Sequence, residues 1–354
     1  MKVTRLCLRL SICLVIAFGA AALPNQNVVY VNCTTGGKVQ AAVDANTTPV
    51  DIVITGICVE NVDIRDKDVN LRSASGNPAL DGIRGRLTTA PALTVRGAVT
   101  GAITNLSFSN NAGQAISIQS GANETLTNCR FENNGGIPLQ VTSAASVTAS
   151  TLTFNANTGR NIAVSGAQFF CTACDVSGSG FALVATRGAI ASLLDTAVTG
   201  GRGILATDGG TSADLDCANG GTSHPCSMQV SGVAVEASSG ARATLFEAGN
   251  FTGQLMAEDG GTVSLIGARQ TGGVTNDADF FGRIIAEADV DVDPPRQSSL
   301  GATNAAHFAR VLVTDNASVQ GTIQCSTAAD AVLDGTVTVA QGAAITGCQH
   351  ASAP

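Results

Sequence analysis

The stretch that decides the fold reads ITNLSFSN at 103–110, LTNCRFEN at 126–133 and ASTLTFNA at 149–156. The position of its phenylalanines recurs every 22 or 23 residues, at Phe108, Phe131, Phe154, Val176 and Val198. A fixed period of this length is typical of a solenoid, in which each repeat stacks on the next. Within a period the apolar residues alternate in short runs, which indicates strands and not helices. We therefore expect an all-β, single-stranded right-handed parallel β-helix.

The composition agrees with a stacked rod. The 354 residues include 40 Gly and no Trp, and 13% are charged. Small residues suit tight turns and crowded stacks, and a solenoid of this length needs no second core. Hydrophobic residues make up 44% of the chain and are periodic, which favours a packed interior over disorder.

Residues 1–22 are predicted to be a secretory signal peptide. Lys2, Arg5 and Arg9 precede an apolar run from Leu10 to Phe18, and small residues follow at 20–22. The run is too short for an ordinary membrane span. We therefore expect a secreted, periplasmic or cell-envelope location and no membrane span.

Loss of that segment leaves 16 basic and 27 acidic side chains, a net charge of −11. This charge disfavours nucleic acid and anionic membranes as partners. A polysaccharide or a component of the cell surface remains as the expected partner.

Nine cysteines follow the predicted signal peptide, and in an exported protein local pairing is the first expectation. We predict the disulfides Cys33–Cys58, Cys217–Cys226 and Cys325–Cys348. Cys129 is predicted to be buried and unpaired, because Cys174 lies two coils away, about 10 Å by strand spacing. Cys171 and Cys174 form a CxxC, which we interpret as a buried pair of core thiols and not as a redox or zinc motif, since both follow the apolar register.

The N-terminal region predicts a capped rod. A strand at 28–31 and a short helix at 38–45 lead to further strands at 52–54, 60–64 and 68–71. The arrangement of GGKVQAAVDA before DIVITGICVENVDIRDKDVNLRS resembles secreted proteins of the pectin-lyase-like right-handed β-helix superfamily. That resemblance implies a fold. It leaves the function open, because one fold hosts many activities.

The domain boundaries follow from the register. We expect an N-terminal cap at 23–50, a β-helix at 51–348 and a tail at 349–354. Within the rod the longer spacings predict an insertion at 209–227 and an irregular loop at 293–304.

Asparagines repeat three residues after the phenylalanines, at Asn111, Asn134 and Asn157. In a stacked turn such residues can adopt the left-handed conformation and hydrogen-bond the next coil, so we interpret them as a structural ladder. The Phe-x-x-Asn pattern also resembles the FxxN repeats of polymorphic membrane adhesins, which supports a solenoid.

No catalytic residue is assigned from the sequence. The enzymes of the resembled superfamily use clustered carboxylates, and polygalacturonase-like members carry an Asp-Asp pair and Gly-His-Gly, neither of which occurs in this chain. The densest charged group is Arg65, Arg72, Asp81, Arg84 and Arg86, which can line a sugar groove or form a solvated outer face.

The sequence requires no cofactor, but one acidic run is a candidate cation-binding site. Asp289, Asp291 and Asp293 fall on one face of a predicted strand. Ca²⁺ would relieve their mutual repulsion, whereas a charged edge strand that resists aggregation explains them without an ion.

Three classes of function stay open. We favour an exported, non-catalytic rod that presents a surface for glycan or cell-envelope binding, adhesion or scaffolding. The alternatives are a polysaccharide lyase, hydrolase or epimerase with an unrecognised site, and a purely structural envelope component.

Overall fold

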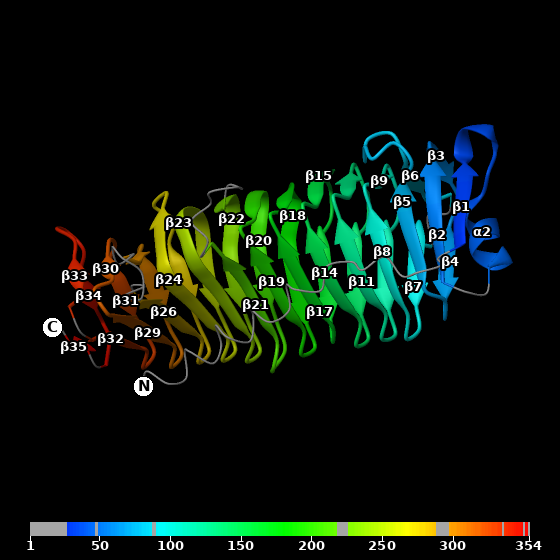
Figure 1. Cartoon of the computed structure of the whole chain (residues 1–354). Helices are drawn as coiled ribbons and strands as arrows, with labels where there is room; N and C mark the ends of the chain where they lie inside the picture. Colours follow the sequence, from blue (N-terminus) through cyan, green and yellow to red (C-terminus); the bar gives the residue numbers. More distant parts are fainter. Residues whose placement is uncertain are drawn as a thin grey trace.

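The computed structural model describes residues 27–46, 49–86, 90–217, 226–287, 297–334, 336–349 and 351–352. Within them the chain winds into a rod of about fourteen turns, with the two ends of the described chain at opposite ends of the rod (Figure 1). All strand pairings are parallel, and each joins a strand to its equivalent one coil away. The expected parallel β-helix is confirmed.

Sheet 1 runs the length of the rod. Its strands are β1 (Asn27–Asn32), β2 (Val50–Thr55), β5 (Val69–Ser73), β8 (Thr100–Thr104), β11 (Asn123–Thr127), β14 (Ser146–Ser150), β17 (Gln168–Thr172), β19 (Ile190–Leu194), β21 (Ser212–Asp216), the starts of β23 (Arg242–Ala257) and β24 (Thr262–Thr271), β26 (Arg283–Glu287), β29 (Arg310–Thr314), β32 (Asp330–Asp334) and β35 (Ala351–Ser352).

Sheet 2 is the second face of each coil. Its strands are β3 (Ile57–Val59), β6 (Gly82–Arg84), β9 (Ser107–Ser109), β12 (Arg130–Glu132), β15 (Thr153–Asn157), the starts of β18 (Asp175–Thr186), β20 (Ala197–Ala206) and β22 (Ser227–Ala237), later parts of β23 and β24, β27 (Ser299–Leu300), β30 (Ser318–Val319) and β33 (Thr338–Val339).

Sheet 3 closes the coil. Its strands are β4 (Val62–Arg65), β7 (Leu93–Arg96), β10 (Ile116–Gln119), β13 (Leu139–Thr142), β16 (Ile162–Ser165), the ends of β18, β20, β22 and β23, then β25 (Asn276–Ala278), β28 (Thr303–Ala305), β31 (Ile323–Cys325) and β34 (Ile345–Thr346).

The core is a set of columns in which equivalent residues of successive coils stack. In sheet 2 the rings of Phe108, Phe131 and Phe154 are fully buried, with centroids 5.7 and 4.6 Å apart. Alternation of inward apolar and outward polar residues along each strand produces these columns because successive side chains point to opposite faces. The 22–23 residue register of the sequence is therefore the register of the coils.

The N-terminal end of the rod is covered by the short helix α2 (Val39–Ala45), which follows the 3₁₀ turn η1 (Cys33–Thr35). Val39 and Val43 are buried against the first coils. The carboxylate of Glu60 accepts hydrogen bonds from the amides of Val39 at 2.8 Å and Gln40 at 3.2 Å, which satisfies two free donors at the helix start. The expected cap helix thus has its apolar face on the core.

Several segments differ from the expected boundaries. β1 lies inside the expected cap, yet it pairs along its whole length with β2 as a strand of sheet 1. β21 falls inside the expected insertion, and β27 and β28 fall at the end of the expected irregular loop. β35 pairs with β32 from within the expected tail. The register of the rod therefore extends further at both ends than the apolar pattern indicated.

The cysteines form four disulfides among the described residues. Cys33 is bonded to Cys58, Cys217 to Cys226 and Cys325 to Cys348, as expected, and Cys129 is a buried thiol. The interpretation of Cys171 and Cys174 as thiols is wrong, since a disulfide joins them across a Cα–Cα distance of 6.3 Å. Cys171 is the last but one residue of β17, and Cys174 directly precedes β18, so the bend between the two strands brings these buried side chains together.

The asparagines at 111, 134 and 157 lie in one buried column. Asn111 donates to the Oδ1 of Asn134 from its amide at 3.0 Å and from its side chain at 2.8 Å, and Asn134 donates to Asn157 in the same way. The expected left-handed conformation is wrong for these residues. It belongs to the residue before each of them, at Asn110, Asn133 and Ala156, so that the asparagine itself turns inward.

Candidate functional site

The charged group at 65–86 does not form one surface, because its members lie on three different sheets. Arg65 is on β4 of sheet 3, Arg72 on β5 of sheet 1 and Arg84 on β6 of sheet 2. The outer faces of the three sheets point in different directions around the coil. Arg86 follows β6, and its backbone amide donates to the side chain of Asn61 at 3.2 Å.

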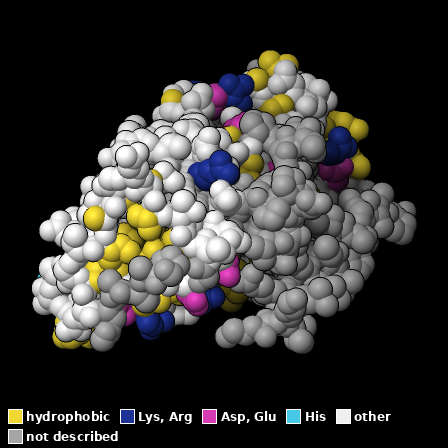
Figure 2. Space-filling model, turned by 90° about the vertical axis from the view of Figure 1, so that its left-hand side faces the viewer, with side chains coloured by type: hydrophobic (Ala, Val, Ile, Leu, Met, Phe, Trp, Pro, Cys, Tyr) yellow, Lys and Arg dark blue, Asp and Glu magenta, His cyan; other side chains and the backbone are white. Residues whose placement is uncertain are grey.

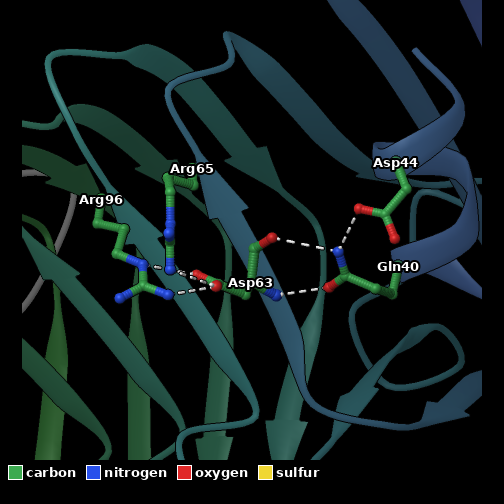
Figure 3. A network of polar contacts seen from close by, with 5 residues as sticks. All are labelled: Gln40, Asp44, Asp63, Arg65 and Arg96. Atoms are coloured by element: carbon green, nitrogen blue, oxygen red, sulfur yellow. Dashed lines mark hydrogen bonds and ion pairs between the residues drawn. The ribbon is translucent and has the colours of Figure 1, made fainter. Parts of the chain in front are cut away.

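Arg65 belongs to a polar network that holds the cap helix (Figure 3). Asp63 on β4 is paired with Arg96 and lies 3.7 Å from the guanidinium of Arg65. The amide of Asp63 donates to the side chain of Gln40 at 2.7 Å, and that side chain also donates to Asp44 at 2.8 Å. Figure 3 shows Gln40 reaching from α2 to β4, so this cluster joins the cap to the first coils.

Arg72 and Asp81 also make contacts that hold parts of the protein together. The Nε of Arg72 is 2.9 Å from the carboxylate of Asp51 on the neighbouring strand. Asp81 is buried and accepts hydrogen bonds from the hydroxyls of Ser73 and Ser75 and from the amides of Gly56 and Ser75. Burial alone would raise the pKa of Asp81, but these hydrogen bonds outweigh it and lower the pKa. Asp81 therefore fixes the loop at 74–81, which projects beside sheet 2 (Figure 1).

Arg84 lines a groove on the outer face of sheet 2, at the foot of that loop. We call this the Arg84 groove, and its volume is about 240 Å³. Its lining residues are Ile57, Ala79, Ile83, Arg84, Ser107, Ser109, Asn110, Arg130 and Glu132. Gly82 lets β6 lie close to β9 beside the groove, because a Cβ on it would lie 2.1 Å from the carbonyl oxygen of Ser107.

The strand register explains how these residues meet. Ser107 of β9 pairs with Arg130 of β12, and Ser109 pairs with Glu132. Arg84 lies on β6, two residues after Gly82, which pairs with Ser107. Outward residues of four successive coils, on β3, β6, β9 and β12, therefore line the groove, with the loop residue Ala79 beside them.

The groove offers hydrogen-bond donors that lack protein partners. Arg130 and Glu132 form an ion pair at 2.5 Å, which neutralises both charges. The Nε of Arg130 is nevertheless buried and has no hydrogen-bond partner within the described residues. Arg84 is exposed, with no acidic partner in the described part of the chain. The groove thus carries a net positive charge, a buried unsatisfied donor and the hydroxyls of Ser107 and Ser109.

The sequence predicted one member of this groove, Arg84, and missed the others. The signal was present in the repeat, since Ser107 and Arg130 occupy one outward position and Ser109 and Glu132 another, 23 residues apart. The sequence did not predict that the loop at 74–81 lies beside the Arg84 groove. The position of this loop depends on the hydrogen bonds of the buried Asp81, which the apolar pattern does not reveal.

The predicted calcium site at Asp289, Asp291 and Asp293 lies outside the described residues. Among the described residues one group presents metal-ligand atoms within 4.8 Å of one another, namely Cys33, Cys58 and Glu60. Its two sulfurs are joined in a disulfide and Glu60 caps α2, so the group is explained without an ion. The described part of the chain contains no helix that is long and apolar enough to cross a membrane.

Comparison with known proteins agrees on the fold. Residues 55–219 match the family model described as "Right handed beta helix region". That match agrees with the right-handed parallel β-helix that the repeat predicts and the strand pairings form.

Two solved structures are similar to it, the A-modules of the mannuronan C-5 epimerases AlgE4 and AlgE6 of Azotobacter vinelandii. The first is 14% identical with a TM-score of 0.29, and the second 13% identical with a TM-score of 0.32. Each match covers 92% of this chain and 100% of the other. Likeness at this level carries no argument about activity. No curated protein matches the chain.

Proposed function

We propose that this is an exported, non-catalytic rod that binds a glycan or another component of the cell envelope, with the Arg84 groove as its binding site. The observation that carries this proposal is the buried Nε of Arg130, which has no hydrogen-bond partner within the described residues, beside the exposed guanidinium of Arg84 in the same groove. A buried donor without a partner is costly, and a ligand oxygen would satisfy it.

The other lining groups suit a saccharide. Sugar hydroxyls both donate and accept hydrogen bonds, and so do the hydroxyls of Ser107 and Ser109 and the amide of Asn110. A volume of 240 Å³ is smaller than the roughly 300–1,000 Å³ of pockets that enclose drug-sized ligands. The groove therefore suits one sugar ring or one side group of a polymer that otherwise lies along the rod.

The groove is a better binding site than a hydrolytic one. Most glycosidases place two carboxyl groups on either side of the scissile bond. The lining residues include one carboxylate, Glu132, and its charge is engaged by Arg130 at 2.5 Å. These contacts favour recognition without turnover.

The proposal is tested by measuring binding to an array of glycans and cell-wall polysaccharides. Arg84→Ala is expected to weaken binding about tenfold or more, because a hydrogen bond to a charged group contributes about 1.5–3 kcal/mol. Arg242→Ala is the matched control, since Arg242 is an exposed arginine on β23, far along the rod. Equal affinity of the wild type and the Arg84 variant would show that the Arg84 groove is not the binding site.

A further inference from the structure

Four aromatic side chains gather at the turns between sheets 3 and 1 in two successive coils near the C-terminal end. We call Phe280, Phe281, His307 and Phe308 the aromatic platform. Phe280 stacks on His307 with ring centroids 4.6 Å apart, and Phe281 stacks on Phe308 at 5.4 Å. The three phenylalanines are 51%, 63% and 59% exposed, whereas Phe108, Phe131 and Phe154 of the core are fully buried.

The backbone at this platform is unfavourable for aromatic residues. All four residues have positive φ, between 43° and 64°. A bulky side chain rarely adopts this left-handed conformation, which glycine adopts without penalty. The two coils before the platform follow that rule: Gly240 and Gly260 donate to the following coil's turn just as Phe281 and Phe308 do, and both have positive φ.

Phe281 and Phe308 therefore stand where other coils place a small residue, glycine at 240 and 260 and alanine at 144 and 328. Their exposure means that packing against the core does not explain them. Strained residues persist where the side chain serves a purpose, so an exposed ring at such a position points to a ligand.

The surroundings of the platform indicate the chemistry of that ligand. Glu258 lies in the coil before Phe280 and Phe281, and Asp277 lies in the same coil as these two residues. Burial, together with the charges of neighbouring carboxylates, raises the pKa of both carboxyl groups. Asp279 directly precedes the platform and lies 2.5 Å from the Nδ1 of His307. This density of carboxylates repels nucleic acid and polyuronates, and it accepts hydrogen bonds from hydroxyl groups.

A neutral pyranose combines the features that this surface requires. Its C–H groups pack on the electron-rich face of an aromatic ring, while its hydroxyls donate to nearby carboxylates. Gly260, one coil before Phe281, has open space where a side chain would be, and Ala328 has the equivalent left-handed turn beyond Phe308. Both ends of the Phe281–Phe308 stack therefore adjoin small residues, which leaves room for a sugar ring.

We propose that the aromatic platform is a second docking site of the rod, which stacks neutral sugar rings of a polysaccharide. This inference rests on the proposed function in one respect, namely that the ligand is a saccharide. It assigns a different place and a different chemistry from the cationic Arg84 groove.

Affinity electrophoresis tests the proposal, in gels that contain galactomannan, hydroxyethyl cellulose or polygalacturonate. The variants are Phe281→Gly and Phe308→Gly, which restore the residue of the earlier coils. Phe170→Ser is the matched control, because Phe170 is a 40% exposed phenylalanine on the outer face of β17. We expect the wild type and the control to be retarded by a neutral polymer, and each glycine variant to bind it about tenfold more weakly.

Thermal unfolding of the same proteins separates binding from packing. Glycine fits the left-handed turn, so the expected melting temperature is unchanged or higher. A lower melting temperature with unchanged retardation would mean that the rings serve the fold, and would overturn the proposal. So would a wild type that migrates freely in both neutral polymers.

Two further results keep this inference apart from the proposed function. If Arg84→Ala abolishes retardation and neither glycine variant changes it, the groove stands and the platform is excluded as a sugar site. If sedimentation shows that the wild type self-associates through the platform, and the glycine variants are monomers without any change in retardation, the occupant is a second copy of the chain and the proposal fails.

Discussion

Glu124 is a carboxylate that points into the core from β11. Its side chain is buried, and Gly101 in the preceding coil makes room for it, since a Cβ there would lie 2.8 Å from a carboxylate oxygen. Burial, and to a smaller extent the negative charge of Asp68, raises the pKa of Glu124 to about 8. The folded protein therefore holds a proton that the unfolded chain releases near its ordinary pKa.

This burial predicts that stability falls as the pH rises. The contribution of protonated Glu124 is fully present below the ordinary pKa of 4.5 and is lost as the pH rises toward 8. The loss is on the order of 5 kcal/mol across that window. Glu124→Gln is expected to flatten this dependence in denaturant unfolding measured from pH 5 to pH 8. The same slope in the variant would show that Glu124 is charged when folded.

The asparagine column predicts a second effect at single residues. Asn134→Leu removes an acceptor used twice by Asn111 and leaves buried donors without a partner. The expected cost is about 1–3 kcal/mol for each stranded group. Asn123→Leu is the control, because Asn123 is exposed at the start of β11. Equal melting shifts of the two variants would contradict a ladder that stabilises the rod.

At the level of elements, disulfides fasten the places where the repeat is interrupted. Cys33–Cys58 joins the turn before α2 to β3, and Cys217–Cys226 closes the segment between β21 and β22. Cys325–Cys348 joins β31 to the chain after β34. The CxxC disulfide differs, since it bridges one bend of a regular coil.

The thiol chemistry of the chain follows from these pairs. Cys129 is buried, and this burial raises the pKa of its thiol to about 12. The thiol is therefore neither accessible nor ionised in the folded state. We expect iodoacetamide to leave the native protein from residue 33 onward unmodified, and to label Cys129 alone after unfolding without reduction. Peptide mapping by mass spectrometry reads the sites. Labelling of Cys171 or Cys174 would show that their disulfide does not form.

At the scale of the whole molecule, the repeat predicted the rod because inward side chains of successive coils must match, which leaves a period in the sequence. The outer surface obeys no such constraint. Arg65, Arg72 and Arg84 are close in sequence, yet the three sheets direct them to different faces. The Arg84 groove also depends on the loop at 74–81, whose position is set by hydrogen bonds to Asp81.

The C-terminal end of the rod illustrates the same limit. Figure 2 views this end, where hydrophobic side chains lie at the surface beside residues that are not described. The aromatic platform was missed from the sequence, although Phe280-Phe281 aligns with Asp259-Gly260 of the preceding coil. If the repeat is aligned beyond Gly260, Phe281 falls at the position that Gly260 occupies in the preceding coil.

The central claim is that the rod binds a saccharide and returns it unchanged. The most direct test incubates the purified protein, at a concentration above its dissociation constant, with the polysaccharide that binds best on the array. Size-exclusion chromatography then measures the complex, and proton NMR with a reducing-end assay measures the recovered polymer. The account predicts a complex that Arg84→Ala weakens and a polymer with unaltered chain length, unsaturation and C-5 configuration. New reducing ends, unsaturated uronate or inverted C-5 centres that disappear with Arg84→Ala would contradict it.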